Sequence, residues 1–139
     1  MPWRAAMNPS PAVLSEEQLR SRLPLELPHW SIEHGRLFRR WRTSGWKSTL
    51  MVVNAIGHLA EAAWHHPDLS VSYAAVDVKL STHSAGGITE KDLALASKIE
   101  QVIGWQPALE PDSVLEGTPN SDPRLRYIRY DTPAPGGTD

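Results

Sequence analysis

The 139-residue chain has no cysteine. Without thiols it has no disulfide framework, no thiolate nucleophile and no thiolate metal site, which fits a reducing compartment. Its first thirty residues also lack the apolar run of a signal peptide, and no stretch approaches the ~20 apolar residues of a membrane span. We therefore expect a cytoplasmic protein that does not enter a membrane.

An excess of positive charge is missing as well. The formal net charge is −2 at pH 7, with 14 lysine and arginine residues against 16 aspartate and glutamate residues. Nucleic acid is not an expected partner, because binding its phosphates needs a concentrated basic surface. The one basic run holds four arginines within residues 36–42, and we interpret it as the solvated face of a strand.

The length and the 40% hydrophobic content predict one domain with a modest core. Residues 1–14 are rich in proline and without a period, and we expect a flexible leader there. Residues 15–104 carry the helical and strand periodicities of the domain. Six of the twelve prolines fall within residues 105–139, a C-terminal extension expected to lack regular structure, except that residues 125–130 favour a strand on an open sheet edge.

Seven segments of the domain have clear patterns. A capping box at Ser15 predicts a short helix that ends before Pro24, and His34-Gly35 predicts a tight hairpin between strands at residues 30–33 and 36–42. A period near 3.6 predicts a long helix over residues 46–64, with Ser44 as its N-cap. Alternation predicts strands at residues 71–73 and 76–83, and a second capping box predicts a helix from residue 89 to residue 104.

This order, α-β-β-α-β-β-α, predicts an α+β fold: a four-stranded antiparallel sheet with three helices packed on one face. The open edges of such a sheet favour a homodimer or a homotetramer. The long helix should face the sheet with a broad apolar stripe. Its members are Trp46, Leu50, Val53, Gly57, Ala60 and Trp64, widened by Val52, Ile56, Leu59 and Ala63.

The long helix ends in a chemically unusual segment. Glu61 and His65 lie four residues apart, so on a helix their side chains share one face and can touch. Pro67 ends the helix, which places both His65 and His66 at a helix terminus. Adjacent imidazoles can supply one proton donor and one acceptor near neutral pH. His83 is expected at a strand end and Asp92 in the first turn of the last helix.

These residues resemble the pattern of the pterin-4a-carbinolamine dehydratase family, also called 4a-hydroxytetrahydrobiopterin dehydratase. The matching features are Glu61, the run His65-His66-Pro67-Asp68, Tyr73, and residues 81–92 with Thr82-His83 and Asp92. The resemblance runs from about Leu27 to Ile103 and includes the opening Leu27-Pro28-His29-Trp30. The chain departs from the family pattern at Trp41, Thr43, Gly45-Trp46 and Trp64, and in its long extension.

The resemblance implies a lyase that removes water from a 4a-hydroxytetrahydropterin in tetrahydrobiopterin recycling, with no metal and no redox cofactor. It implies that His65, His66 and His83 are catalytic, with His65 and His83 as the acid/base candidates and His66 holding or polarising the pterin, and it leaves open which histidine does which. It also implies that Glu61 orients His65 by a hydrogen bond, that Asp92 orients a histidine or the pterin, and that Trp30 forms a wall beside the ring.

Other interpretations stay open. Asp92 has the position of an ordinary helix cap, Glu61 that of a surface carboxylate, and Trp30 is a candidate core residue. A relative of the dehydratases can also act as a non-catalytic binding or assembly factor, for RuBisCO or a transcription factor, with the C-terminal extension as the surface for a protein partner. Three histidines and a carboxylate can instead hold zinc or iron.

Overall fold

The computed structural model describes residues 11–119 and 121–130. Ten residues of the expected leader and the last nine residues of the extension lie outside this range. The last residue of the leader segment, Leu14, donates its backbone N–H to the carbonyl oxygen of Ile88 at 2.8 Å. The N-terminal segment therefore meets the domain beside the loop that precedes the last helix.

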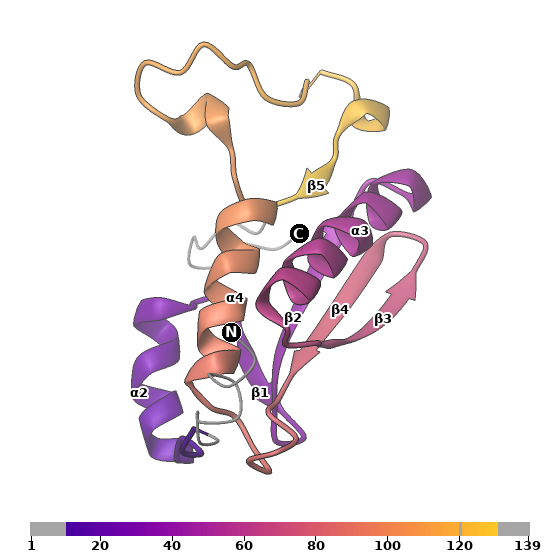
Figure 1. Cartoon of the computed structure of the whole chain (residues 1–139). Helices are drawn as coiled ribbons and strands as arrows, with labels where there is room; N and C mark the ends of the chain where they lie inside the picture. Colours follow the sequence, from indigo (N-terminus) through magenta and orange to yellow (C-terminus); the bar gives the residue numbers. More distant parts are fainter. Residues whose placement is uncertain (1–10, 120, 131–139) are drawn as a thin grey trace.

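The domain is one antiparallel sheet with helices on one face (Figure 1). The first four strands stand in the order β1-β2-β4-β3, which confirms the predicted α+β class. The elements are α2 (Glu16–Glu26), β1 (Ser31–Glu33), β2 (Arg36–Thr43), α3 (Trp46–Ala63), β3 (Asp68–Ser72), β4 (Ala75–Leu80) and α4 (Glu90–Ile103).

The strands bury one side in two-residue alternation. On β4, Val76, Val78 and Leu80 are fully buried against the helices. The β1–β2 hairpin is closed by His34 and Gly35, whose φ angles are 53° and 74°. Two successive residues with positive φ suit the right-handed twist of a two-residue hairpin. The predicted hairpin is therefore confirmed.

Helix α2 runs past the proline at which it was expected to end. Pro24 lies inside the helix, and the backbone N–H of Leu27 still reaches the carbonyl oxygen of Leu23 at 2.8 Å. Leu23 and Leu27 are both buried in the core. Burial of these two side chains explains why the helix continues, since apolar burial offsets the hydrogen bond that a proline removes.

Helix α3 buries only part of the predicted face: Val52, Ile56 and Ala60 are buried as expected. Trp46, Leu50 and Trp64 are exposed, and the buried side chains are Ser48, Thr49, Val52, Ile56 and Ala60. Two of these are hydroxyl residues whose burial is compensated by hydrogen bonds, as when the Thr49 hydroxyl donates to the Tyr73 carbonyl oxygen at 2.9 Å. A hydrophobic pattern does not detect such residues, so the predicted stripe included the exposed tryptophans and Leu50 and left out the buried hydroxyl residues at the start of the helix.

The N-cap of α3 was also predicted wrongly. Gly45 occupies that position without a side-chain hydrogen bond, and the Ser44 hydroxyl donates instead to the carbonyl oxygen of Arg126 in the extension. Of the helices in residues 11–119 and 121–130, none is both long enough and apolar enough to cross a membrane.

The C-terminal extension leaves the end of α4 and returns to the sheet (Figure 1). It contains two short 3-10 helices, Pro107–Leu109 and Pro123–Leu125, followed by strand β5 (Ile128–Arg129). Strand β5 pairs antiparallel with the last two residues of β2, which makes it a fifth strand of the sheet. Ile128 is only 4% exposed and belongs to the hydrophobic core.

Candidate active site

The end of α3 sets the directions of the two adjacent histidines. Trp64 has left-handed backbone angles, φ 52° and ψ 48°, and the backbone N–H of His65 donates back to the Ala60 carbonyl oxygen at 3.1 Å. A left-handed residue closes a helix and turns the chain away from its axis. The following Pro67 confines His66 to extended angles. His65 therefore turns toward α4, and His66 stays on the outside.

His65 is paired with a buried carboxylate. Its Nε2 lies 2.6 Å from Oδ1 of Asp92, the third residue of α4. The His65 side chain is 14% exposed and the Asp92 side chain 0% exposed. Because a carboxylate only accepts hydrogen bonds, the hydrogen atom must be on Nε2 of His65. In the neutral imidazole this leaves Nδ1 as the basic nitrogen.

The second oxygen of Asp92 is held by the protein as well. Oδ2 accepts hydrogen bonds from the Thr82 hydroxyl and from the Thr89 backbone N–H, both at 2.9 Å. The hydroxyls of Thr82 and Thr89 are themselves 2.8 Å apart, and both residues are buried. The predicted capping box is thus present, with Asp92 as its third helical residue. Asp92 therefore caps α4 and orients His65 at the same time.

His66 is paired with Glu61. Its Nε2 lies 2.7 Å from Oε1 of Glu61, and the two side chains are 48% and 70% exposed. The Trp64 ring meets the His66 ring edge-on, with the centroids 5.0 Å apart. The expected Glu61–His65 hydrogen bond was therefore wrong. A continuous helix would have put those two residues on one face, but the left-handed Trp64 exchanges the positions of the two imidazoles.

His83 lies in a tight turn beyond the sheet. Strand β4 ends at Leu80, so the expectation of a strand running to His83 was wrong by three residues. Thr82 forms an isolated bridge with Gly87, and His83 is exposed between them. The Thr82 hydroxyl ties this turn to Asp92. Within the described part of the chain no hydrogen bond joins His83 directly to His65 or His66.

Trp30 is not brought to the histidines. It is 4% exposed in the core, and its indole N–H donates to Oε1 of Glu100 at 2.7 Å. Arg39 donates to the same oxygen at 2.6 Å. Glu100 lies eight residues beyond Asp92, about 12 Å along α4. The structure gives Trp30 a packing role in place of the expected wall beside the pterin.

Thr82 and Thr89 were not predicted as site residues, although both are needed to hold Asp92. The capping-box pattern identified Thr89 as a helix cap, and Thr82 is the neighbour of a predicted histidine. Nothing local indicates that their hydroxyls meet, because they lie on either side of a turn.

The structure does not support the metal interpretation. In residues 11–119 and 121–130, no three or more histidine, aspartate or glutamate side chains form a group that could hold a metal ion. In both His65 and His66, the Nε2 atom is hydrogen-bonded to a carboxylate oxygen.

The fold and the site define a class of protein: a small α+β domain with carboxylate-paired histidines at the end of its central helix, an arrangement suited to proton transfer. The family model described as pterin 4 alpha carbinolamine dehydratase matches residues 12–102. The chain belongs to this family.

Similar proteins agree with that assignment. A protein of Aquifex aeolicus, provisionally named pterin-4-alpha-carbinolamine dehydratase, is 49% identical over 90 residues, which are 65% of this chain and 90% of the relative. One of Chloroflexus aurantiacus with the same provisional name is 41% identical over 91 residues, 66% of this chain and 97% of the relative.

A solved structure from Brucella melitensis is described as a transcriptional coactivator/pterin dehydratase. It matches this structure with a TM-score of 0.59 and 28% sequence identity, and the match covers 65% of this chain and 97% of the Brucella chain. These matches span nearly the whole length of each relative. The family model ends at residue 102, so the extension lies beyond the match.

Proposed function

We propose that this protein is a 4a-hydroxytetrahydropterin dehydratase that gives quinonoid dihydropterin in tetrahydrobiopterin recycling. The observation that carries the proposal is the 2.6 Å contact between His65 and the buried Asp92, which fixes a proton on Nε2 and presents a basic Nδ1. Family membership and the names of the relatives support the same reaction class.

The reaction needs two proton transfers. An acid protonates the 4a-hydroxyl so that the carbon–oxygen bond breaks and water leaves. A base takes the proton from N5, and the electrons of that N–H bond form the carbon–nitrogen double bond. Imidazoles can serve both steps near neutral pH, and no metal or redox cofactor is needed. His65, His66 and His83 are the candidate catalytic residues, with the assignment of acid and base left open.

The two carboxylates act as positioning residues in this proposal. Asp92 holds His65 in one tautomer and one orientation from a fully buried position, whereas Glu61 holds His66 from the surface. The hydrogen bond that each imidazole Nε2–H donates to its carboxylate stabilises the imidazolium that forms when the ring accepts a proton. His65 is therefore the more rigidly placed of the pair.

The test is the rate at which purified protein accelerates the decay of freshly generated 4a-hydroxytetrahydropterin, followed by absorbance. We expect acceleration by the wild type and none by His65→Ala/His66→Ala. His83→Ala should keep its fold, since His83 is exposed, and should lose about 10²-fold or more in turnover. Absence of acceleration by folded wild type, or full activity in folded His83→Ala, would contradict these assignments.

A second candidate function is a binding or assembly factor, and the observation that favours it is the extension, which lies beyond the family match and folds onto the β2 edge. The relative from Brucella melitensis also has coactivator in its description. A partner interaction that is lost on deletion of residues 105–139, while dehydratase activity persists, would support this role. Catalysis and partner binding do not exclude each other.

A further inference from the structure

His83 lies in a turn, residues 82–87, that two backbone hydrogen bonds close at its base. The N–H of Thr82 donates to the Gly87 carbonyl oxygen at 2.8 Å, and the N–H of Gly87 donates to the Thr82 carbonyl oxygen at 3.4 Å. The His83 side chain is exposed and so is not fixed by burial in the core. The position of this imidazole therefore depends on how the base of the turn is held.

One side of the base is tied to the paired histidine. The Thr82 hydroxyl donates to Oδ2 of Asp92 at 2.9 Å, and Oδ1 of Asp92 lies 2.6 Å from Nε2 of His65. A path of hydrogen bonds thus runs from the turn to His65. This path holds only Thr82, the first residue of the turn.

The other side of the base lies against residues 13–14. The backbone N–H of Leu14 donates to the carbonyl oxygen of Ile88 at 2.8 Å. The Leu14 side chain packs against the core, and Ile88 is 4% exposed. Cγ1 of Val13 lies only 2.8 Å from the position that a Cβ atom would have at Gly87. Residues 13–14 therefore meet this side of the base through a hydrogen bond and a close side-chain contact.

The two glycines of the turn are required for different reasons. Gly86 has a φ of 77°, a backbone conformation that favours glycine. Gly87 has no positive φ, so its backbone conformation alone would accept another residue. A larger residue at position 87 would instead meet the side chain of Val13. Glycine at this position therefore allows the N-terminal segment to approach the turn closely.

We propose that Val13 and Leu14 are positioning residues of the candidate active site. They hold the Gly87 side of the turn and so keep His83 in place relative to His65. This role rests on the proposed dehydratase function, in which an acid and a base act on one substrate. A small displacement of a catalytic group lowers turnover strongly, because the reacting atoms lose their alignment.

Gly87→Ala tests the contact in the full-length protein. The new methyl group would occupy space that a Val13 methyl group needs, so Val13 must shift and the hydrogen bond from Leu14 should weaken. We expect faster amide hydrogen exchange at Leu14 and Thr82, and a kcat about tenfold lower with KM little changed. A contact that only stabilised the fold would not lower kcat while leaving KM unchanged.

The double variant Val13→Ala/Gly87→Ala is the matched rescue. Cβ of Val13 lies 3.7 Å from the position of the new methyl group, an ordinary contact, so the two alanines fit together. One methyl group then takes the place of the other. We expect kcat and both exchange rates to return close to the wild-type values.

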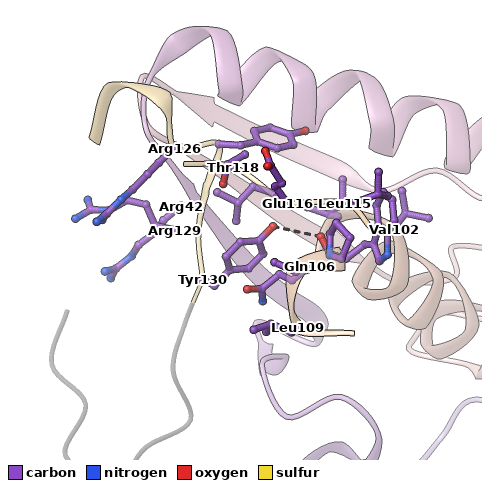
Figure 2. A pocket seen from close by; sticks show the side chains of 17 residues that line it. Arg42, Val102, Gln106, Leu109, Leu115, Glu116, Thr118, Arg126, Arg129 and Tyr130 are labelled. Atoms are coloured by element: carbon purple, nitrogen blue, oxygen red, sulfur yellow. Dashed lines mark hydrogen bonds between the residues drawn. The ribbon is translucent and has the colours of Figure 1, made fainter. Parts of the chain in front are cut away.

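Val102→Ala controls for the loss of a half-exposed valine, since Val102 is 44% exposed and Val13 is 49% exposed. Val102 lies near the end of α4, where it lines a cavity of ≈ 960 Å³ beside the C-terminal extension (Figure 2). None of the three candidate catalytic histidines is among the residues that line this cavity. We expect Val102→Ala to leave kcat and the exchange rate of Leu14 unchanged.

Three results would overturn the proposal: Gly87→Ala leaves amide exchange at Leu14 and Thr82 unchanged, it speeds exchange but keeps the wild-type kcat, or the double variant does not recover. A wild type without dehydratase activity would instead contradict the proposed function. The exchange rates would then still show whether residues 13–14 hold the turn.

Discussion

Asp92 is the residue on which the geometry of the candidate active site depends. It is completely buried, and its two oxygens serve His65 on one side and Thr82 and Thr89 on the other. A buried carboxylate that is fully hydrogen-bonded has one orientation. The same network therefore fixes the helix start, the turn that carries His83, and the proton on His65.

Thr82→Val tests this network at the scale of one hydroxyl group. Without that donor Asp92 can rotate, so we expect turnover to fall roughly tenfold or more, with KM little changed. Thr82→Ser, which keeps the hydroxyl, should recover most of the loss. The ¹⁵N chemical shifts of the His65 imidazole should report a mixture of tautomers in Thr82→Val and one tautomer in the wild type.

The matched control is Thr49→Val, because Thr49 is equally buried and its hydroxyl lies 2.7 Å from that of Thr43. Both valine variants should lose about 1–2 kcal/mol of stability. Only the Thr82 variant should lose turnover, and equal losses of turnover in the two would show that Thr82 has a structural role alone.

At the scale of elements, the sheet and α4 are joined by a buried ion pair. Arg39 of β2 and Glu100 of α4 meet at 2.6 Å with side chains 6% and 22% exposed, and the Arg39 guanidinium lies 3.7 Å from the centroid of the Trp41 ring. Removing one partner of such a pair leaves an uncompensated buried charge. The pair therefore holds α4 in register on the sheet.

Glu100→Ala should lower the free energy of unfolding by about 3 kcal/mol, measured by urea denaturation, because it leaves Arg39 buried without that carboxylate. Glu26→Ala is the control, since its carboxylate pairs with Arg22 at the surface and should contribute little. Similar losses in the two variants would mean that Arg39 finds another partner.

The extension is the other element with a measurable contribution. Ile128→Ala removes a core side chain that is 4% exposed, and we expect a loss of about 2 kcal/mol of stability. Val114→Ala, at a 93% exposed position of the same extension, should leave stability unchanged. A neutral Ile128→Ala would show that the core does not need β5.

At the scale of the whole molecule, α3 has an apolar outer face. Trp46, Leu50 and Met51 are 49%, 40% and 47% exposed and lie within five residues of one another on the helix. Exposed apolar patches of this kind commonly mark protein–protein interfaces. The expected homodimer or homotetramer stays a prediction, and this face is the best candidate for its contact.

Light scattering after size-exclusion chromatography should give at least twice the 15.4 kDa mass of one chain. Leu50→Glu should lower that mass, because burying a carboxylate in an apolar contact is costly. Val114→Glu, at an exposed position away from α3, should keep it. A monomeric wild type would exclude the predicted assembly.

The sequence by itself determined most of the local structure. The hairpin at His34-Gly35, the extent of α3 and the capping box at Thr89 followed from periodicity, turn residues and capping residues, which act over a few residues. The residue types and their spacing also predicted the candidate site residues, which are three histidines and two carboxylates at the ends of helices and strands.

The tertiary structure alone decided how these groups pair. The left-handed Trp64 reverses the order of the two imidazoles, and the packing of α4 against α3 brings Asp92 to His65 across 27 positions of sequence. The tertiary structure also determined that buried hydroxyl side chains face the sheet at the start of α3, where the sequence predicted apolar side chains. These contacts depend on long-range packing and hydrogen bonding, which leave no periodic trace in the residues that make them.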